Sequence, residues 1–116
     1  MGSFPKHLRI KNDNLMQQLF SRGKSVSCGG ITLKYMEEQK ELKVGFAAPK
    51  RLHSSAVKRN LIKRRMRNSF RLQQHILGPS FVGVGYFIYN EPEIKNSQEI
   101  YDAFTVLLKK WKDCGT

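Results

Sequence analysis

The sequence contains little cysteine and no long apolar run. Its two cysteines, Cys28 and Cys114, lie far apart without a CxxC partner, so they predict neither a disulfide framework nor a redox motif. No apolar run approaches the roughly 18 residues that span a bilayer. The N-terminus also lacks the apolar core of a secretory signal. We therefore expect a cytoplasmic protein without a membrane partner.

Histidines and carboxylates are also not grouped as enzyme chemistry would require. The three histidines show no metal-ligand spacing, and no paired carboxylates or Ser-His-Asp set stand near the basic segment described below. A protein nuclease that holds magnesium itself needs clustered acids beside its phosphates. We therefore expect no catalytic residue and no metal site in the polypeptide.

Negative charge is scarce and unevenly placed. Lys and Arg total 21 against nine acidic residues, which gives a formal net charge of +12. No acid lies between Glu41 and Glu91, whereas ten of the 21 basic residues lie in that stretch. Such concentrated charge predicts a polyanionic partner. Composition alone leaves RNA, DNA and an anionic membrane surface open.

The length suits one compact domain, whose elements follow from hydrophobic periodicity and capping residues. A strand on either side of a basic helix predicts a crossover unit within a small α+β sandwich. We expect the two early strands to pair as an antiparallel hairpin, and the first helix to cover the open sheet face only partly, leaving a groove. The predicted elements are a helix at 13–22, strands at 31–35 and 42–46, a helix at 56–77 capped by Ser54 or Ser55, a central strand at 81–89, and a helix that begins with a capping box of Asn96 and Glu99 and runs to about Asp113.

The predicted helix at 56–77 has one cationic side. Its apolar side is expected to collect Leu61, Ile62, Met66, Leu72 and Ile76. Like charges four residues apart destabilise an isolated helix by about a few tenths of a kcal/mol per pair, and no Glu relieves them here. An external polyanion is therefore expected to supply the countercharge; a merely solvated basic face is the alternative. The cationic ridge consists of Arg59, Lys63, Arg67 and Arg71, with Asn60 and Arg64 beside it.

Two further cations, Lys58 and Arg65, fall on the apolar side of this helix. Their alkyl stems either lie along its margin with the charge in solvent, or they contact a second RNA segment. The residue types on the ridge suit RNA. Arg offers a planar fork to phosphate oxygens, and the Asn60 side chain offers both a hydrogen-bond donor and an acceptor.

The run from Ser55 to Arg67, SAVKRNLIKRRMR, resembles the signature of the bacterial ribonuclease P protein family, N-A-V-x-R-N-x-x-K-R-x-x-R. The segment GFAAPKR at 45–51 is similar to the family's G-[FL]-S-V-S-K-K, and 15–25 is similar to its first helix and following turn. The resemblance spans about residues 4 to 113, which we take as one domain, and Met1–Ser3 are expected to be a cloning remnant. The signature positions matched are Arg59, Asn60, Lys63, Arg64 and Arg67.

The resemblance implies an α-β sandwich with a left-handed crossover at the basic helix, a rare exception to the usual handedness. It implies a ribonucleoprotein that removes the 5′ leader from precursor tRNA, with hydrolysis on the RNA subunit and magnesium bound mainly by that RNA. The basic helix is expected to pack on ribonuclease P RNA, as a monomer in a 1:1 complex. Flanking RNA contacts are expected from Lys50, Arg51, Lys58 and Arg65.

The resemblance also implies a groove for the single-stranded leader between the first helix and the sheet. Candidate residues are Met16, Phe20, Thr32 and Lys34, although Met16 and Phe20 share a helical stripe whose default place, without the resemblance, is the core. The chain departs from the family at several places, because Met16 replaces an aromatic residue, Ser55 replaces Asn, and Pro49 replaces a small polar residue. Lys34 stands where the family often has Tyr, although the adjacent Tyr35 leaves that register open. Phe46 is expected in the core.

Two other functions remain open at this level. A ribosomal protein or general RNA chaperone would share the charge but have no processing role. A sequence-specific DNA-binding protein would need a helix aimed at base edges.

Overall fold

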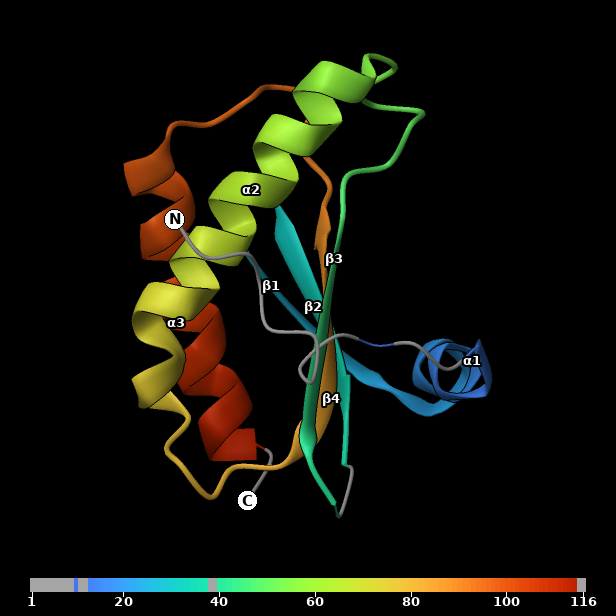
Figure 1. The fold of residues 1–116 in the computed structure, drawn as a ribbon, viewed down its shortest axis with the longest axis vertical. Helices are drawn as coiled ribbons and strands as arrows, with labels where there is room; N and C mark the ends of the chain where they lie inside the picture. Colours follow the sequence, from blue (N-terminus) through green and yellow to red (C-terminus); the bar gives the residue numbers. More distant parts are fainter. Residues whose placement is uncertain (1–9, 11–12, 38–39, 115–116) are drawn as a thin grey trace.

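The computed structural model describes residues 10, 13–37 and 40–114. A four-stranded sheet forms its middle layer, and α-helices lie on both faces (Figure 1). The elements in chain order are α1 (Asp13–Arg22), β1 (Lys24–Cys28), β2 (Ile31–Met36), β3 (Leu42–Ala47), α2 (Ala56–Gln73), a 3-10 turn (Gln74–Ile76), β4 (Gly83–Tyr89) and α3 (Ser97–Cys114).

The sheet order is β1-β2-β4-β3, so the predicted hairpin of the two early strands is wrong. β4 lies between β2 and β3; it is antiparallel to β2 and parallel to β3. β2 ends at Met36 and β3 begins at Leu42, two strand spacings or about 10 Å apart, a distance that five intervening residues easily reach. Inserting β4 also places the strand that is apolar on both faces in the interior of the sheet, as its composition predicted.

One strand, β1, was not predicted because three of its five residues are Lys or Ser. It forms a hairpin with β2 through Gly29 and Gly30, whose φ angles of 58° and 81° suit a two-residue turn that needs left-handed backbone at both positions. A Gly-Gly pair before an alternating run was the available sequence signal.

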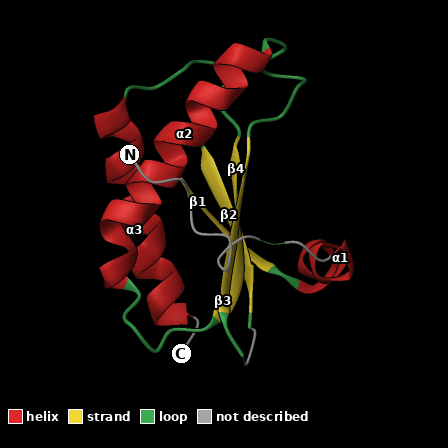
Figure 2. Cartoon of the chain, viewed as in Figure 1, coloured by secondary structure: helices red, strands yellow, loops and turns green. Residues whose placement is uncertain are grey.

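Helices α2 and α3 cover one sheet face and α1 lies on the other (Figure 2). The parallel strands β3 and β4 are joined through α2, so the predicted crossover unit is present. The left-handedness of this crossover remains an implication of the family resemblance. The main core lies under α2 and α3, where Phe87 stacks on Phe104 with ring centroids 4.4 Å apart. Phe46 packs against both rings, as expected.

Predicted caps begin both long helices. The Ser55 hydroxyl accepts a hydrogen bond from the Lys58 amide at 3.4 Å. At α3, the Asn96 side chain accepts from the Glu99 amide at 2.8 Å, and the Glu99 carboxylate accepts from the Asn96 amide at 3.1 Å. This reciprocal pair is the predicted capping box, and it satisfies donors that the first helical turn leaves without partners.

The buried face of α2 differs from the predicted apolar side. Leu72 is 48% exposed, whereas polar Gln73 is buried and donates to the Tyr101 carbonyl of α3 at 2.8 Å. α3 packs along α2 and accepts this amide, so hydrogen bonding rather than hydropathy decides which side chain faces inward. The buried residues of α2 are Ile62, Met66, Ser69, Phe70 and Gln73.

Candidate nucleic-acid interface

The cationic side of α2 remains accessible in the folded chain. Asn60, Arg64 and Arg71 are exposed, and Arg59, Lys63 and Arg67 are half-buried along the same side. Within the part of the chain that the structure describes, no carboxylate lies in ion-pair contact with Arg59, Lys63 or Arg64. Their charge is thus not neutralised by a described acid, which is what an external polyanion requires.

Two arginines of this ridge bond to neutral groups. Arg59 donates through Nη1 to the carbonyls of His53 and Ser54, both at 2.8 Å. Arg71 donates through Nη2 to the Asn68 side-chain oxygen at 2.7 Å. Because these acceptors are uncharged, they orient the guanidinium groups without cancelling their positive charge.

The predicted flanking cations divide into two groups. Lys50, Arg51 and Lys58 are exposed at the turn before α2 and in its first helical turn. Arg65 is half-buried and donates to the Lys95 carbonyl at 2.7 Å, so it ties α2 to the connection between β4 and α3. Of these four, Arg65 therefore has a structural role in the free protein.

The second candidate surface lies between α1 and the open sheet face. Phe20 of α1 is 47% exposed; its ring meets Tyr86 edge-on at 5.8 Å, and Lys34 Nζ lies 5.7 Å from its centroid. Lys34 pairs with Tyr86 across the strands, whereas Tyr35 is buried in the core, which resolves the register that the sequence left open. Met16 is half-buried on α1.

Polar groups continue this surface along β2. The Thr32 hydroxyl lies 3.0 Å from the Ser27 hydroxyl, and it accepts a hydrogen bond from the side-chain nitrogen of Asn90 at 2.8 Å. Thr32 and Lys34 alternate with buried residues, as predicted for the polar side of this strand. The open face therefore combines an aromatic platform, a cation and a row of hydroxyl and amide groups.

The sequence-based prediction did not include Tyr86 and Asn90 among the site residues, because it treated the β4 segment as apolar on both faces. Alternation within it was the available signal, because Tyr86 faces opposite to the buried Phe87 and Tyr89. Burial raises the pKa of the Tyr86 phenol above its ordinary value. The phenol is therefore neutral at physiological pH and adds no negative charge to this face.

Comparison with known proteins identifies this architecture. Residues 4–112 match the family model described as Ribonuclease P. The chain belongs to the ribonuclease P protein family. It is 32% identical over 109 residues to the ribonuclease P protein component of Nitrosococcus oceani, covering 93% of this chain and 87% of that protein. The corresponding protein of Exiguobacterium sibiricum is 30% identical over 113 residues, covering 92% and 95%.

Structural similarity agrees with the sequence match. The ribonuclease P protein of Staphylococcus aureus superposes with a TM-score of 0.76 at 23% identity, covering 89% of this chain and 94% of that one, so the two share a fold. Family membership makes the chain a protein component of the tRNA-processing ribonucleoprotein endonuclease ribonuclease P, and a partner of its RNA. The alternative of a ribosomal protein or general RNA chaperone finds no support in these comparisons.

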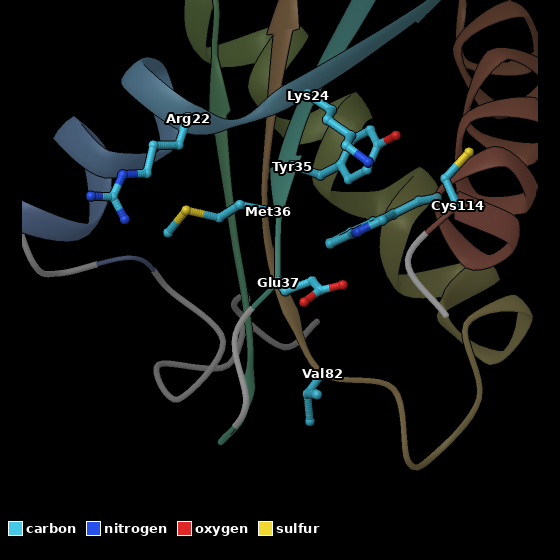
Figure 3. Close-up of a pocket in the computed structure, with 8 residues that line it drawn as sticks. Arg22, Lys24, Tyr35, Met36, Glu37, Val82 and Cys114 are labelled. Carbon is cyan, nitrogen blue, oxygen red and sulfur yellow. The ribbon is translucent and has the colours of Figure 1, made fainter.

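This ribonuclease P protein also has a cavity of about 260 Å³ at the end of the sheet where β2 and α3 finish (Figure 3). Although Arg22 and Lys24 line it, Glu37 does too, and both α1 and α3 end there with their carbonyl groups. Helix C-termini disfavour anions, so the cavity is a poor phosphate site. Burial, and to a smaller extent the neighbouring Cys114 thiol, raises the pKa of the Tyr35 phenol above its ordinary value.

The residues that the structure describes show neither a metal cluster nor a membrane-spanning helix. No group of three or more His, Cys, Asp or Glu side chains comes together there as a metal site. None of the helices described is both long and apolar enough to cross a bilayer.

Proposed function

We propose that the α2 ridge binds ribonuclease P RNA and that the face between α1 and the sheet binds the 5′ leader of precursor tRNA. One observation carries the proposal. No carboxylate among the described residues makes an ion pair with Arg59, Lys63 or Arg64 on the cationic side of α2. Arginine forks bind phosphate oxygens side by side, and such contacts dominate the affinity of proteins for nucleic acids.

The open sheet face suits a single strand. A base can stack on the exposed part of the Phe20 ring, whose other edge rests on Tyr86. Lys34 beside the ring is placed to attract the adjoining phosphate. Single-stranded nucleic acids are bound by this combination of aromatic platforms and nearby cations, with little need for base-specific hydrogen bonds.

In this proposal the protein has no reacting side chain. Phosphodiester hydrolysis takes place on the RNA subunit, with magnesium bound mainly by that RNA, and one protein copy joins one RNA. The protein's share is to neutralise phosphates where RNA subunit and leader approach each other, which lowers their mutual repulsion.

Reconstitution tests the proposed function. Precursor tRNA is incubated with folded ribonuclease P RNA and magnesium at near-physiological salt, with and without the protein. We expect the protein to speed leader removal, because phosphate repulsion between the two RNAs is strongest without it. An unchanged rate would reject the proposal. A gain that persists after the protein is digested would indicate a chaperone that had only refolded the RNA.

Replacing Phe20 with alanine is expected to lower the affinity of the reconstituted enzyme for precursor tRNA by roughly 5- to 150-fold, the equivalent of one stacked base. Affinity for mature tRNA, which has no leader, should stay the same. Equilibrium binding of both tRNAs measures the difference. Leu72→Ala is a matched control, since Leu72 is 48% and Phe20 47% exposed. Equal losses for the two tRNAs would reject the leader assignment.

A further inference from the structure

His53 is a buried histidine in the connection between β3 and α2, with only 5% of its surface exposed. Its Nε2 donates to the Glu91 carbonyl at 2.7 Å, and its ring lies against Tyr89 with centroids 5.8 Å apart. This hydrogen bond joins the segment before α2 to the segment after β4. None of the sequence patterns assigned it a role.

The Glu91 carbonyl belongs to a well-braced segment. The Tyr89 hydroxyl donates to the Glu93 carbonyl at 2.7 Å and accepts from the Lys95 amide at 2.9 Å. Arg65 then bonds the Lys95 carbonyl from α2. His53 is thus anchored to a fixed point, and its own main chain is held by the bond from its amide to the Pro49 carbonyl at 3.1 Å.

The main-chain carbonyls of His53 and Ser54 hold the Arg59 guanidinium. Both accept from Nη1 at 2.8 Å, which accounts for both hydrogens of that nitrogen. Nε and Nη2 keep three N–H groups without a partner among the described residues. These groups form the edge of the guanidinium that can grip two phosphate oxygens.

We propose that His53 is a positioning residue: through its bond to Glu91 it fixes the carbonyls that orient Arg59, so that Arg59 presents its remaining fork to one phosphate of the RNA. The inference rests on the proposed RNA-binding role of α2. An arginine held in its binding geometry loses less side-chain entropy when it binds, so the anchor raises affinity without touching RNA.

Two amide substitutions separate this role from mere burial. In His53→Gln the side-chain nitrogen can occupy the Nε2 position and reach the Glu91 carbonyl, whereas the shorter His53→Asn cannot. We expect His53→Asn to weaken binding of ribonuclease P RNA about 2- to 10-fold, the worth of one hydrogen bond. His53→Gln should restore most of that loss. Binding is measured across a salt series, on protein shown to be folded by circular dichroism.

A double-mutant cycle shows through which residue His53 acts. In the Arg59→Ala background, His53→Asn should hardly weaken RNA binding further, because the side chain that His53 positions is gone. In the Lys63→Ala background, His53→Asn should weaken RNA binding by the same factor as in the wild type. Equal losses of RNA affinity in both backgrounds would overturn the inference while leaving the RNA-binding role of the ridge intact.

If Arg59→Ala and Lys63→Ala leave RNA affinity unchanged, the proposed function fails, and the inference fails with it. If His53→Asn does not fold, His53→Leu, which nearly keeps the ring volume, replaces it in the same cycle.

Discussion

Replacing Arg59, Lys63 and Arg64 together by alanine is expected to weaken the binding of ribonuclease P RNA by about a hundredfold near physiological salt. Each cation that neutralises a phosphate releases condensed counterions, and each such contact contributes about 0.7–0.9 to the slope of log affinity against log salt. Removing three should therefore reduce that slope by about two to three. A titration of labelled RNA at several salt concentrations measures both quantities.

The structure supplies a charge-matched control for this variant. Lys24, Lys109 and Lys110 are exposed and lie on β1 and α3, so none of them belongs to the cationic side of α2. Their triple alanine variant removes the same charge, so long-range attraction falls equally in the two proteins. We expect the control to lose only a small part of the affinity and to keep most of the slope. Equal losses would show that net charge, and not the α2 ridge, holds the RNA.

Replacing Gly85 with alanine is expected to destabilise the protein by about 3 kcal/mol, through overpacking of the core. A Cβ at this position would lie 2.5 Å from Cη2 and 2.8 Å from Cζ3 of Trp111. The indole has little room to move, because it is buried and meets Phe81 and Phe87 edge-on at 5.1 and 6.3 Å. β4 has little room either, since Gly85 pairs with Tyr35 on one side and Val44 on the other.

Thermal unfolding measures this effect, and the midpoint should fall by roughly 10–20 °C for a domain of this size. Trp111→Phe provides the control, because the smaller ring leaves space for the new methyl group. Gly85→Ala should then lower the stability of the Trp111→Phe protein clearly less than that of the wild type. An unchanged cost would mean that the clash with the indole is not the cause.

Much of the secondary structure could be predicted because its signals are local. The Ser55 cap and the Asn96–Glu99 capping box both formed as their spacing indicated. α1 ends at Arg22 and β2 alternates as predicted. Each of these features depends on residues within one or two turns of one another, so no knowledge of the rest of the chain is needed.

The errors concern residues whose neighbours come from elsewhere in the chain. Leu72 looked like a core residue, but α3 offers a carbonyl that makes Gln73 the better buried partner. Tyr86 looked like one more apolar residue of β4, but its partner across the strand is Lys34 and its ring neighbour is Phe20. Helix and strand periodicity cannot foresee such contacts, because they join elements that are distant in sequence.

The sequence by itself determined the cationic side of α2, since 3.6-residue periodicity and the absence of acids between Glu41 and Glu91 are properties of the chain alone. Only the tertiary structure decided that β4 separates β2 from β3, and that the Glu91 carbonyl accepts from His53, whose own carbonyl accepts from Arg59. Strand order and long-range hydrogen bonds depend on which distant surfaces best bury apolar groups and satisfy polar ones, and that competition is settled only when the whole domain packs.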